Sequence, residues 1–441
     1  MKRSPFPRLF WVGNIIEILE RFAYYGLYMG FAIYATTAAS NGGLGLSKTA
    51  LGPIQFLFLF LSYLVPLISG VLADRFGFKK MLLVSFMLYL PGFLFLLLTR
   101  RYIMILIIMT LIGIAAGIFK PLIAGTVRLT TDASNRTLGF GIFYLMVNVG
   151  AFFGPITAGA LRTTSWNHAF IASALATGLM IIVTLLWYRD PIRIEKDPGK
   201  RPPISATFRD IIPFLKEPRI LTFIFIFGVF IEIPFWTFFN VITMFVDKWV
   251  RTDLLYQSFT GFFSSIGLDS FGRMFVGWFS TLGPDGVHRI AGETLGHTAL
   301  YIILFQMLVT RSSERWRSVP TIATGILVMV LGCLGLFLST GSLPGLMFLG
   351  ILLFAVGEMT CMPRFEQYLI SMLPPEKTGL GGGLLRIPIA IGAISALTTT
   401  PLYGFLESKD IPQTTWLVVA AWLVLGFSLV VLYDRKFRTE G

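Results

Sequence analysis

Apolar runs long enough to cross a bilayer recur from one end of this 441-residue chain to the other. A span needs about 20 consecutive, mostly apolar residues, because the hydrocarbon core is about 30 Å thick and a helix rises about 1.5 Å per residue. Hydrophobic residues make up 55% of the chain and charged residues 13%, which excludes a water-soluble domain of this length. Because lipid offers the backbone no hydrogen-bond partners, runs of this length must be helical. We therefore predict an all-α polytopic membrane protein.

About twelve such segments follow one another along the chain. The first six lie near residues 9–38, 49–73, 81–99, 102–127, 138–161 and 168–188, and the second six near 219–247, 294–310, 318–339, 345–373, 379–405 and 411–433. They predict an N-terminal six-helix bundle over 1–190 and a C-terminal six-helix bundle over 219–441, with a substrate site between them. The connection over 191–218 is rich in proline and basic residues, which is typical of a solvated linker.

The outer connection over residues 248–293 is unusually long and interleaves aromatic residues with glycine and serine. We predict an amphipathic helix or a gate that lies on the outer face of the membrane. The alternative is a further spanning segment, which would place all later loops on the opposite side.

The net charge of +13 does not indicate nucleic-acid binding, because the basic residues gather in alternate loops. Three fall within residues 75–80 and three within 311–317. Positively charged loops stay in the cytoplasm. We therefore predict an integral protein of the plasma (inner) membrane with both termini in the cytoplasm.

Cofactor and catalytic signatures are not found in the sequence. The two cysteines, Cys333 and Cys361, lie in apolar runs and are interpreted as core residues, and the three histidines lack the spacing of metal ligands. With no phosphate loop and no nucleophile–base pair either, we predict that the protein is not an enzyme and that it uses no metal or cofactor.

The first predicted span carries charge where lipid-facing helices carry none. Residues 17–26 read Glu-Ile-Leu-Glu-Arg-Phe-Ala-Tyr-Tyr-Gly, and at 100° per residue Glu17, Glu20, Arg21, Tyr24, Tyr25 and Tyr28 share one side of the helix. Each intramembrane charge costs about 2.5–3.5 kcal/mol, so such residues face a bundle interior or a watery cavity. They either form an ion pair that joins neighbouring helices or line a proton-coupled, charged pocket.

Four other spans carry isolated polar groups. Lys120 precedes a proline inside an apolar run, and either reaches for the membrane surface or points into a pocket. Tyr144 and Asn148 share a helix face and either bond a neighbouring helix or line the pocket. Glu232 and Glu358 are lone carboxylates inside apolar spans, which makes them candidate functional groups.

Several of these motifs together point to a family. The loop at residues 70–80, Gly-Val-Leu-Ala-Asp-Arg-Phe-Gly-Phe-Lys-Lys, closely resembles the signature of the major facilitator superfamily. The run at 17–25, Phe-Lys-Pro at 119–121 and the Phe-Tyr…Asn-x-Gly-Ala-Phe pattern at 143–152 resemble the proton-dependent oligopeptide transporters of that superfamily. The segments at 227–232 and 357–363 resemble two further motifs of the same family, so the resemblance covers the N-terminal half well and the C-terminal half in pieces.

The resemblance implies a major-facilitator fold and a role for each polar residue. Proton coupling is assigned to Glu17, Glu20, Arg21 and Glu232. The substrate is expected to contact Arg21, Tyr25, Tyr28, Tyr63, Lys120, Tyr144, Asn148 and Glu358. In this assignment Glu358 meets the amino group of the substrate and pairs with Lys120 when the pocket is empty, and Lys120 pairs alternately with the acids of the first span.

This chain also departs from the family pattern. A second arginine of the first span is replaced by Tyr28, and two large aromatic residues are replaced by Gly228 and Leu385. A serine of the tenth span is replaced by Met362. The asparagine that the family carries in its eighth span has no secure counterpart here, although His297 lies nearby. Additional charges are present at Arg364, Glu366 and Arg386. We expect a pocket of changed shape, so that the mode of transport carries over better than the substrate.

Three functions remain open from the sequence. The first is a proton-coupled symporter of di- or tripeptides or peptide-like solutes that works by alternating access, functions as a monomer, and has the substrate, protons and the lipid bilayer as partners. The second is a proton-coupled transporter of another organic anion or amphipath on the same fold. The third is a membrane receptor or scaffold that transports nothing.

Overall fold

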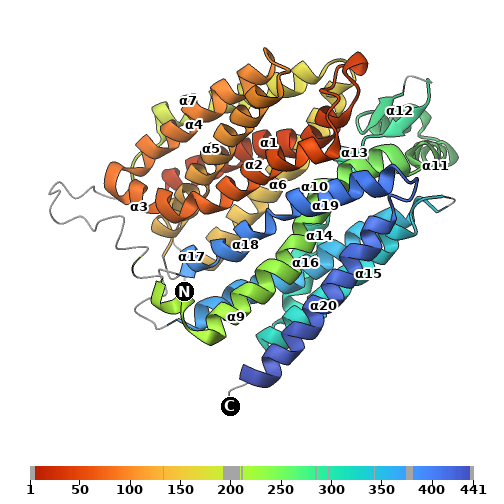
Figure 1. Cartoon of the computed structure of the whole chain (residues 1–441). Helices are drawn as coiled ribbons and strands as arrows, with labels where there is room; N and C mark the ends of the chain where they lie inside the picture. The colour runs from red at the N-terminus through yellow and green to blue at the C-terminus, as the bar shows by residue number, and fades with distance from the viewer. Residues whose placement is uncertain are drawn as a thin grey trace.

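The computed structural model describes residues 5–132, 134–191, 209, 212–283, 286–295, 298–341, 343–373 and 381–437. The protein is almost entirely helical, and its helices gather in two bundles that lie side by side (Figure 1). The described ends of the chain, at the start of α1 and the end of α20, lie on the same side of the membrane-spanning region, which we call the terminus side. The opposite side carries a small β-hairpin and is called the hairpin side.

The N-terminal bundle contains α1 to α7. Its helices are α1 (Arg8–Thr36), α2 (Lys48–Leu64), α3 (Pro66–Phe76), α4 (Phe78–Leu96), α5 (Tyr102–Leu129), α6 (Arg136–Arg162) and α7 (Trp166–Trp187), with a short 3-10 turn, η1 (Ala39–Asn41), after α1. Ser47 begins α2 by accepting a hydrogen bond from the Ala50 amide at 3.1 Å. Helices α2 and α3 form one span bent by 46° where Pro66 begins α3.

The C-terminal bundle follows the linker. Its elements are α9 (Pro218–Phe227), η3 (Gly228–Glu232), α10 (Ile233–Trp249), α11 (Thr252–Ser265), α12 (Asp269–Gly277), β1 (Ser280–Leu282), β2 (His288–Ile290), α13 (Gly292–Leu295), α14 (Ala299–Ser313), α15 (Ser318–Phe337), α16 (Leu346–Ser371), α17 (Gly381–Leu384), α18 (Arg386–Gly392), α19 (Ser395–Glu407) and α20 (Thr414–Phe437). Most of the predicted linker, 191–218, lies outside the described residues.

The predicted spans correspond to helices in the structure. Within the described residues, nine helices are long and apolar enough to cross a membrane, and the bent pair α2–α3 makes a tenth. The two remaining predicted segments correspond to α1, which carries several charges, and to α14, which has 15 residues. The protein is therefore an integral membrane protein with many apolar helices, as the sequence predicted.

The region between α10 and α13 contains no helix of bilayer length among its described residues. It folds into α11, α12 and an antiparallel hairpin in which Ser280 pairs with Ile290 and Leu282 with His288. Helices of 14 and 9 residues are too short to span. The alternative of an additional spanning segment here is therefore wrong.

Candidate functional site

The charged face of α1 is buried near the middle of the membrane-spanning region. Glu17, Glu20 and Arg21 are exposed by 4%, 0% and 6%. Arg21 forms ion pairs with both acids, through Nε to Glu17 Oε1 at 3.2 Å and through Nη2 to Glu20 Oε2. The hydroxyl of Tyr89 on α4 donates a 2.6 Å hydrogen bond to the other oxygen of Glu20. Removing one member of this cluster would leave a buried charge without its partner.

Close packing of α1 on α6 places this cluster in the bundle interior. A Cβ atom added at Gly150 would lie 2.5 Å from the Ile18 carbonyl oxygen and 2.6 Å from Arg21 Cβ. One turn later, a Cβ at Gly154 would overlap the carbonyl oxygen of Phe22. The backbones can approach this closely only because glycine has no side chain. This contact gives the glycine of the 143–152 motif a structural role.

Lys120 points into the interior rather than toward the membrane surface. Its Nζ atom is buried and has no hydrogen-bond partner among the described residues. The ammonium instead lies 3.4 Å from the centre of the Tyr63 ring on α2 and 5.3 Å from that of Tyr24. Such cation–π contacts stabilise a desolvated cation by about 2 kcal/mol. The surface-reaching interpretation of Lys120 is therefore excluded.

Neither ion pair expected for Lys120 is formed in this structure. The described residues contain no ion pair between Lys120 and an acid of α1 or Glu358. One oxygen of Glu358 accepts a 3.0 Å hydrogen bond from the Thr298 hydroxyl, which precedes α14. Arg386 on α18 lies close enough to Lys120 for the two positive charges to repel each other. The Lys120 amino group is thus buried and has no ion-pair partner among the described residues.

The tyrosines predicted to line a pocket surround these charges. Tyr25 lies beside Arg21, with 5.9 Å between the guanidinium carbon and the ring centre. The Tyr144 side chain is 53% exposed, yet it interacts electrostatically with Glu358, Glu366 and Tyr25. Since those groups belong to α16 and α1, the exposed ring of Tyr144 faces the space between the bundles.

Asn148 lies one turn from Tyr144 and is buried. Its side-chain amide donates a 2.8 Å hydrogen bond to the Tyr144 carbonyl oxygen, within the same helix. Among the described residues it makes no hydrogen bond to a neighbouring helix. The interhelical bond considered for this residue is absent from the structure.

Glu232 is the last residue of η3, a π-helical turn between α9 and α10. Its side chain is buried, and its backbone packs on α18, where a Cβ at Gly392 would lie 3.0 Å from the Glu232 carbonyl oxygen. Single π-helical turns inside longer helices occur frequently at functional sites. The turn sets Glu232 toward α18 within its own bundle.

The loss of a large aromatic residue at Gly228 does not leave an open space. A Cβ atom at this position would lie 2.9 Å from Ile391 Cδ1, so the Ile391 side chain occupies the space. Leu385, at the second departure, is buried. The expected change of pocket shape at Gly228 is therefore a replacement of one apolar surface by another.

A hydrogen-bonded network joins the bundles on the hairpin side. The Tyr28 hydroxyl donates to Asn240 Oδ1 at 2.8 Å, and Gln55 Nε2 donates to the Asn240 carbonyl oxygen at 3.4 Å. Thr400 then donates to Gln55 Oε1 at 3.1 Å, and Asn240 Nδ2 to Ser395 at 2.9 Å. Tyr28, assigned to the substrate from sequence, is here a link between α1 and α10.

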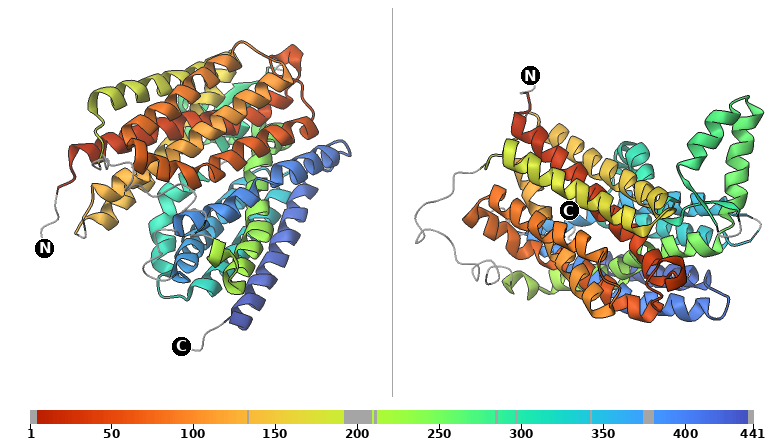
Figure 2. Two further views of the ribbon diagram at one scale, coloured as in Figure 1. Left: turned by 60° about the vertical axis from the view of Figure 1, so that its left-hand side comes forward. Right: turned by 90° about the horizontal axis from the view of Figure 1, so that it is seen from above.

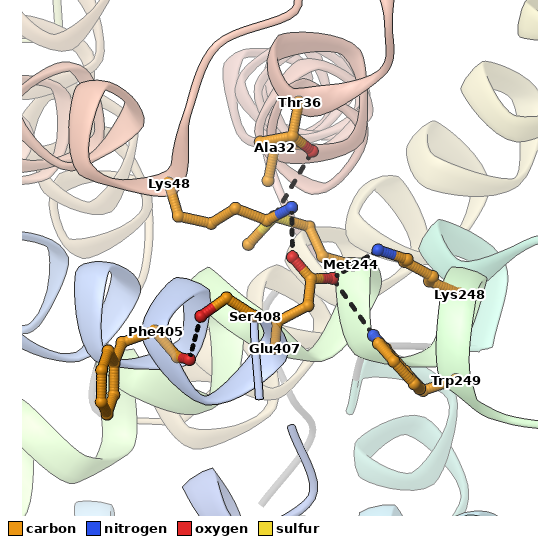
Figure 3. A network of polar contacts seen from close by, with 9 residues as sticks. All are labelled: Ala32, Thr36, Lys48, Met244, Lys248, Trp249, Phe405, Glu407 and Ser408. Atoms are coloured by element: carbon orange, nitrogen blue, oxygen red, sulfur yellow. Dashed lines mark hydrogen bonds and ion pairs between the residues drawn. The ribbon is translucent and has the colours of Figure 1, made fainter. Parts of the chain in front are cut away.

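Ion pairs reinforce the same closure nearer the membrane surface. Glu407 at the end of α19 binds Lys48 of α2 at 2.7 Å and Lys248 and Trp249 of α10 at 3.1 Å each (Figure 3). Arg162 at the end of α6 binds Asp247 at 2.6 Å and also pairs with the buried Glu293. Both clusters join the N-terminal bundle to the C-terminal bundle.

The terminus side lacks such links among the residues that the structure describes. Every hydrogen bond and ion pair between described residues of the two bundles lies in the hairpin-side half of the membrane-spanning region. Among the described residues, polar contacts therefore join the bundles on the hairpin side alone. The arrangement corresponds to a state that is closed toward the hairpin side.

Sequence reasoning missed the residues that fasten the bundles. Gln55 and Asn240 are single amide side chains inside apolar runs, the same signal that marked Glu232, and they could have been found in that way. Arg162 and Glu293 lie at the ends of predicted spans, where charges are ordinary. His297, considered as a substitute for the asparagine of the eighth span, lies outside the described residues.

Comparison with known proteins assigns this architecture to a family. The family model described as Major Facilitator Superfamily matches residues 21–287, more than half of the chain. The chain belongs to the Major Facilitator Superfamily. The loop at residues 70–80 had indicated this superfamily, and that prediction is confirmed.

Individual members of the superfamily resemble the chain in part. It is 32% identical over 168 residues to the uncharacterized transporter YclF of Bacillus subtilis, with 37% of this chain and 34% of that protein covered. It is 28% identical over 220 residues to a di-/tripeptide transporter of Lactococcus lactis, with coverage of 49% and 44%. The matches thus span less than half the length of these relatives.

The solved structure of a peptide transporter POT in complex with alafosfalin has the same fold. The TM-score is 0.69 at 22% identity, and 99% of this chain and 96% of that one are covered. The relatives named here are described as transporters, and the likeness to the solved structure shows that the chain shares the fold of such a protein.

Proposed function

We propose that the protein is a proton-coupled secondary active transporter, a symporter of di- or tripeptides or peptide-like solutes that works by alternating access. One observation carries this proposal. A buried, unpaired ammonium at Lys120 lies near the acids and arginine of α1, and the carboxylates of α16 lie on the other side of the space between the bundles. A solute with one anionic and one cationic end complements this arrangement of charges.

The α1 cluster supplies a chemical basis for coupling between proton binding and substrate binding. Arg21 is shared by Glu17 and Glu20, so a proton added to either acid removes one of its two anionic partners. The guanidinium then has capacity for a substrate carboxylate beside Lys120. Loss of the proton restores the ion pair and weakens substrate binding, which links the two ligands through one cation.

The proposed substrate site also includes groups from both bundles. Tyr25, Tyr63 and Tyr144 offer rings and hydroxyls, while Glu358 and Glu366 of α16 offer negative charge for an amino group. Arg386 adds a cation from the C-terminal bundle. We assign Glu232 to protonation and Asn148 to support of the pocket.

The proposal also fixes an orientation. We place the protein in the plasma (inner) membrane, as a monomer, with the terminus side in the cytoplasm, because the basic loops lie on that side. The state closed toward the hairpin side is then the inward-facing state. When the Tyr28–Asn240 network and the Glu407 and Arg162 clusters break, the hairpin side opens.

A second candidate function is the transport of another organic anion or amphipath on the same fold. The observation that favours it is the engagement of Tyr28 with Asn240, which leaves no helix-1 group at this position for a peptide carboxylate. A receptor or scaffold without transport is the third possibility.

The test is uptake of labelled dialanine and trialanine into proteoliposomes with an imposed proton gradient, acid outside. Accumulation that collapses on addition of a protonophore, and that is absent from empty liposomes, is the expected result. If folded protein accumulates neither peptide, the peptide proposal is wrong. Gradient-driven uptake of larger organic anions in the same vesicles would then support the second function, and uptake of no solute would support the third.

A further inference from the structure

The region between α10 and α13 forms an arm that extends sideways from the protein. Helices α11 and α12 make a helical hairpin that reverses near Gly267, which has φ of +75°. Viewed from above, the two helices run across the long axis of the bundles and project beyond their outline at the hairpin side (right panel of Figure 2). A helix pair in this position extends roughly parallel to the membrane surface.

The two helices hold each other through aromatic rings. Phe263 of α11 contacts Phe271 and Phe275 of α12, with 5.5 and 6.0 Å between ring centres. Phe275 in turn contacts Phe279 before β1 at 5.2 Å. These contacts use one face of each helix and make the arm a compact unit.

A second apolar face of the arm is exposed among the residues that the structure describes. Phe262 and Ile266 of α11 are 60% and 53% exposed, and Met274 and Trp278, on and after α12, are 53% and 62% exposed. Residues 252–282 contain only three charged side chains, Asp253, Asp269 and Arg273. Exposed apolar surface of this kind marks a site of interaction with lipid or protein.

The direction of this face follows from a contact with α16. Phe259, Phe262 and Ile266 follow the i, i+3, i+7 spacing of one helix stripe. Phe259, at the start of this stripe, contacts Phe348 in the first turn of α16 at 5.9 Å between ring centres. The next residue, Leu349, is 47% exposed on that membrane-spanning helix. The stripe on the arm therefore continues the apolar surface of the spans.

The chain connections keep the arm at the level of the membrane surface. Only two residues separate the end of α10 at Trp249 from the start of α11 at Thr252, a distance of about 7–10 Å at full extension. On the return path, Ala291 alone separates β2 from α13. An apolar stripe with tryptophan and phenylalanine at this height matches the residues that anchor proteins at the membrane interface.

We propose that the α11–α12 arm lies in the interface of the bilayer leaflet on the hairpin side, with Phe262, Ile266, Met274 and Trp278 inserted among the lipids. The polar side chains of α11, such as Gln257, face water. The occupant of the apolar face is thus lipid, rather than a second copy of this chain. This inference does not depend on the transported substrate.

A single fluorescent label tests the proposal. The native cysteines Cys333 and Cys361 are buried, so an introduced cysteine can be labelled with the environment-sensitive dye NBD in the full chain. Ile266→Cys reports the apolar stripe, Trp278→Cys gives a second position, and Gln257→Cys on the polar face is the matched control. The variants are reconstituted into phosphatidylcholine–phosphatidylglycerol vesicles.

We expect labels at 266 and 278 to emit at shorter wavelength than the label at 257. Lipids with a doxyl group near the head group are expected to quench both labels. Iodide is expected to quench them at least threefold less than it quenches the label at 257. Equal iodide quenching at all three positions, without doxyl quenching, would overturn the proposal. Shielding from iodide that disappears when the protein is diluted in lipid would also overturn it, because the occupant would then be a second copy.

Discussion

The hydroxyl of Tyr28 donates a 2.8 Å hydrogen bond to the side-chain oxygen of Asn240, 212 residues away, and thereby joins α1 to α10. Both residues are buried, and Asn240 also bonds Ser395 of α19. The bond therefore joins the C-terminal bundle directly to the helix that carries the charged cluster.

Tyr28→Phe is expected to shift the protein away from the state closed toward the hairpin side. A buried hydrogen bond of this kind contributes about 0.5–1.5 kcal/mol, so the ratio of closed to open molecules falls by about 2- to 12-fold. Spin labels on Ser40→Cys and Lys409→Cys, both exposed on the hairpin side, measure the distance. Tyr34 lies on the same helix and makes no hydrogen bond to the other bundle among the described residues, so Tyr34→Phe is the control and leaves the distance distribution unchanged. An identical shift in both variants contradicts the prediction.

Lys120→Ala is expected to abolish gradient-driven uptake while the protein remains folded. The amino group is buried without an ion-pair partner among the described residues, so its removal leaves no opposite charge unpaired but takes away the group proposed to bind the substrate. Proteoliposome uptake and thermal unfolding in detergent are measured together. Lys409→Ala, in an exposed turn, serves as the matched loss of charge. Retained uptake in Lys120→Ala would remove this residue from the pocket.

Glu17→Gln or Glu20→Gln is expected to retain exchange and lose accumulation. Each substitution mimics a permanently protonated acid and leaves Arg21 with one anionic partner. Counterflow, in which labelled substrate exchanges for unlabelled substrate without a gradient, continues, whereas proton-driven uptake falls to the level of empty vesicles. Accumulation that survives in both variants would show that coupling resides elsewhere.

Arg386→Gln is expected to raise KM for a free peptide more than for the same peptide with an amidated C-terminus. The Arg386 charge lies near Lys120 and repels it, so together they favour an anionic group between them. The two KM values in each protein give the result as a ratio. A change that is equal for both substrates would make Arg386 a residue that shapes the pocket without recognising the carboxylate.

Gly150→Ala is expected to destabilise the protein by about 1–3 kcal/mol, because the added methyl group would overlap the α1 backbone. Thermal unfolding in detergent reports the change. Gly141→Ala on the same helix adds its methyl group where no described atom lies within 4 Å, and a glycine-to-alanine change in an open helical position stabilises by about 0.5–1 kcal/mol. Equal effects at the two positions would contradict the proposed packing of α1 on α6.

The spans were predictable because bilayer thickness sets one length scale for every segment. Even α1, which carries several charges, was found from the apolar residues on either side of Glu17 and Arg21. The breaks within spans were not predictable in detail. Pro234 follows the π-helical turn and Gly392 ends α18, but such residues do not by themselves show whether a span bends, breaks or continues.

The site was predictable where a single residue violates the apolar pattern. Glu20 and Lys120 are costly in lipid, so the sequence favoured their burial in the interior, while it left open for Lys120 a position at the membrane surface. The residues that contact such side chains could not be predicted from the sequence. Lys120 contacts Tyr63 from another helix, and Thr400 reaches Gln55 across 345 residues. Pairings of this kind depend on how helices distant in sequence are arranged.

The π-helical turn at Gly228–Glu232 divides one long span into two helices, α9 and α10, which contact different parts of the protein. On its terminus side, α9 packs within its own bundle, with Phe227 stacked on Phe365 of α16 at 3.6 Å and Arg219 bonded to Tyr368. On its hairpin side, α10 reaches across to α1 through Asn240. A turn with one extra residue is a natural flexure point. The hairpin-side half, α10, can therefore tilt away from α1 at this turn while α9 keeps its position in the C-terminal bundle.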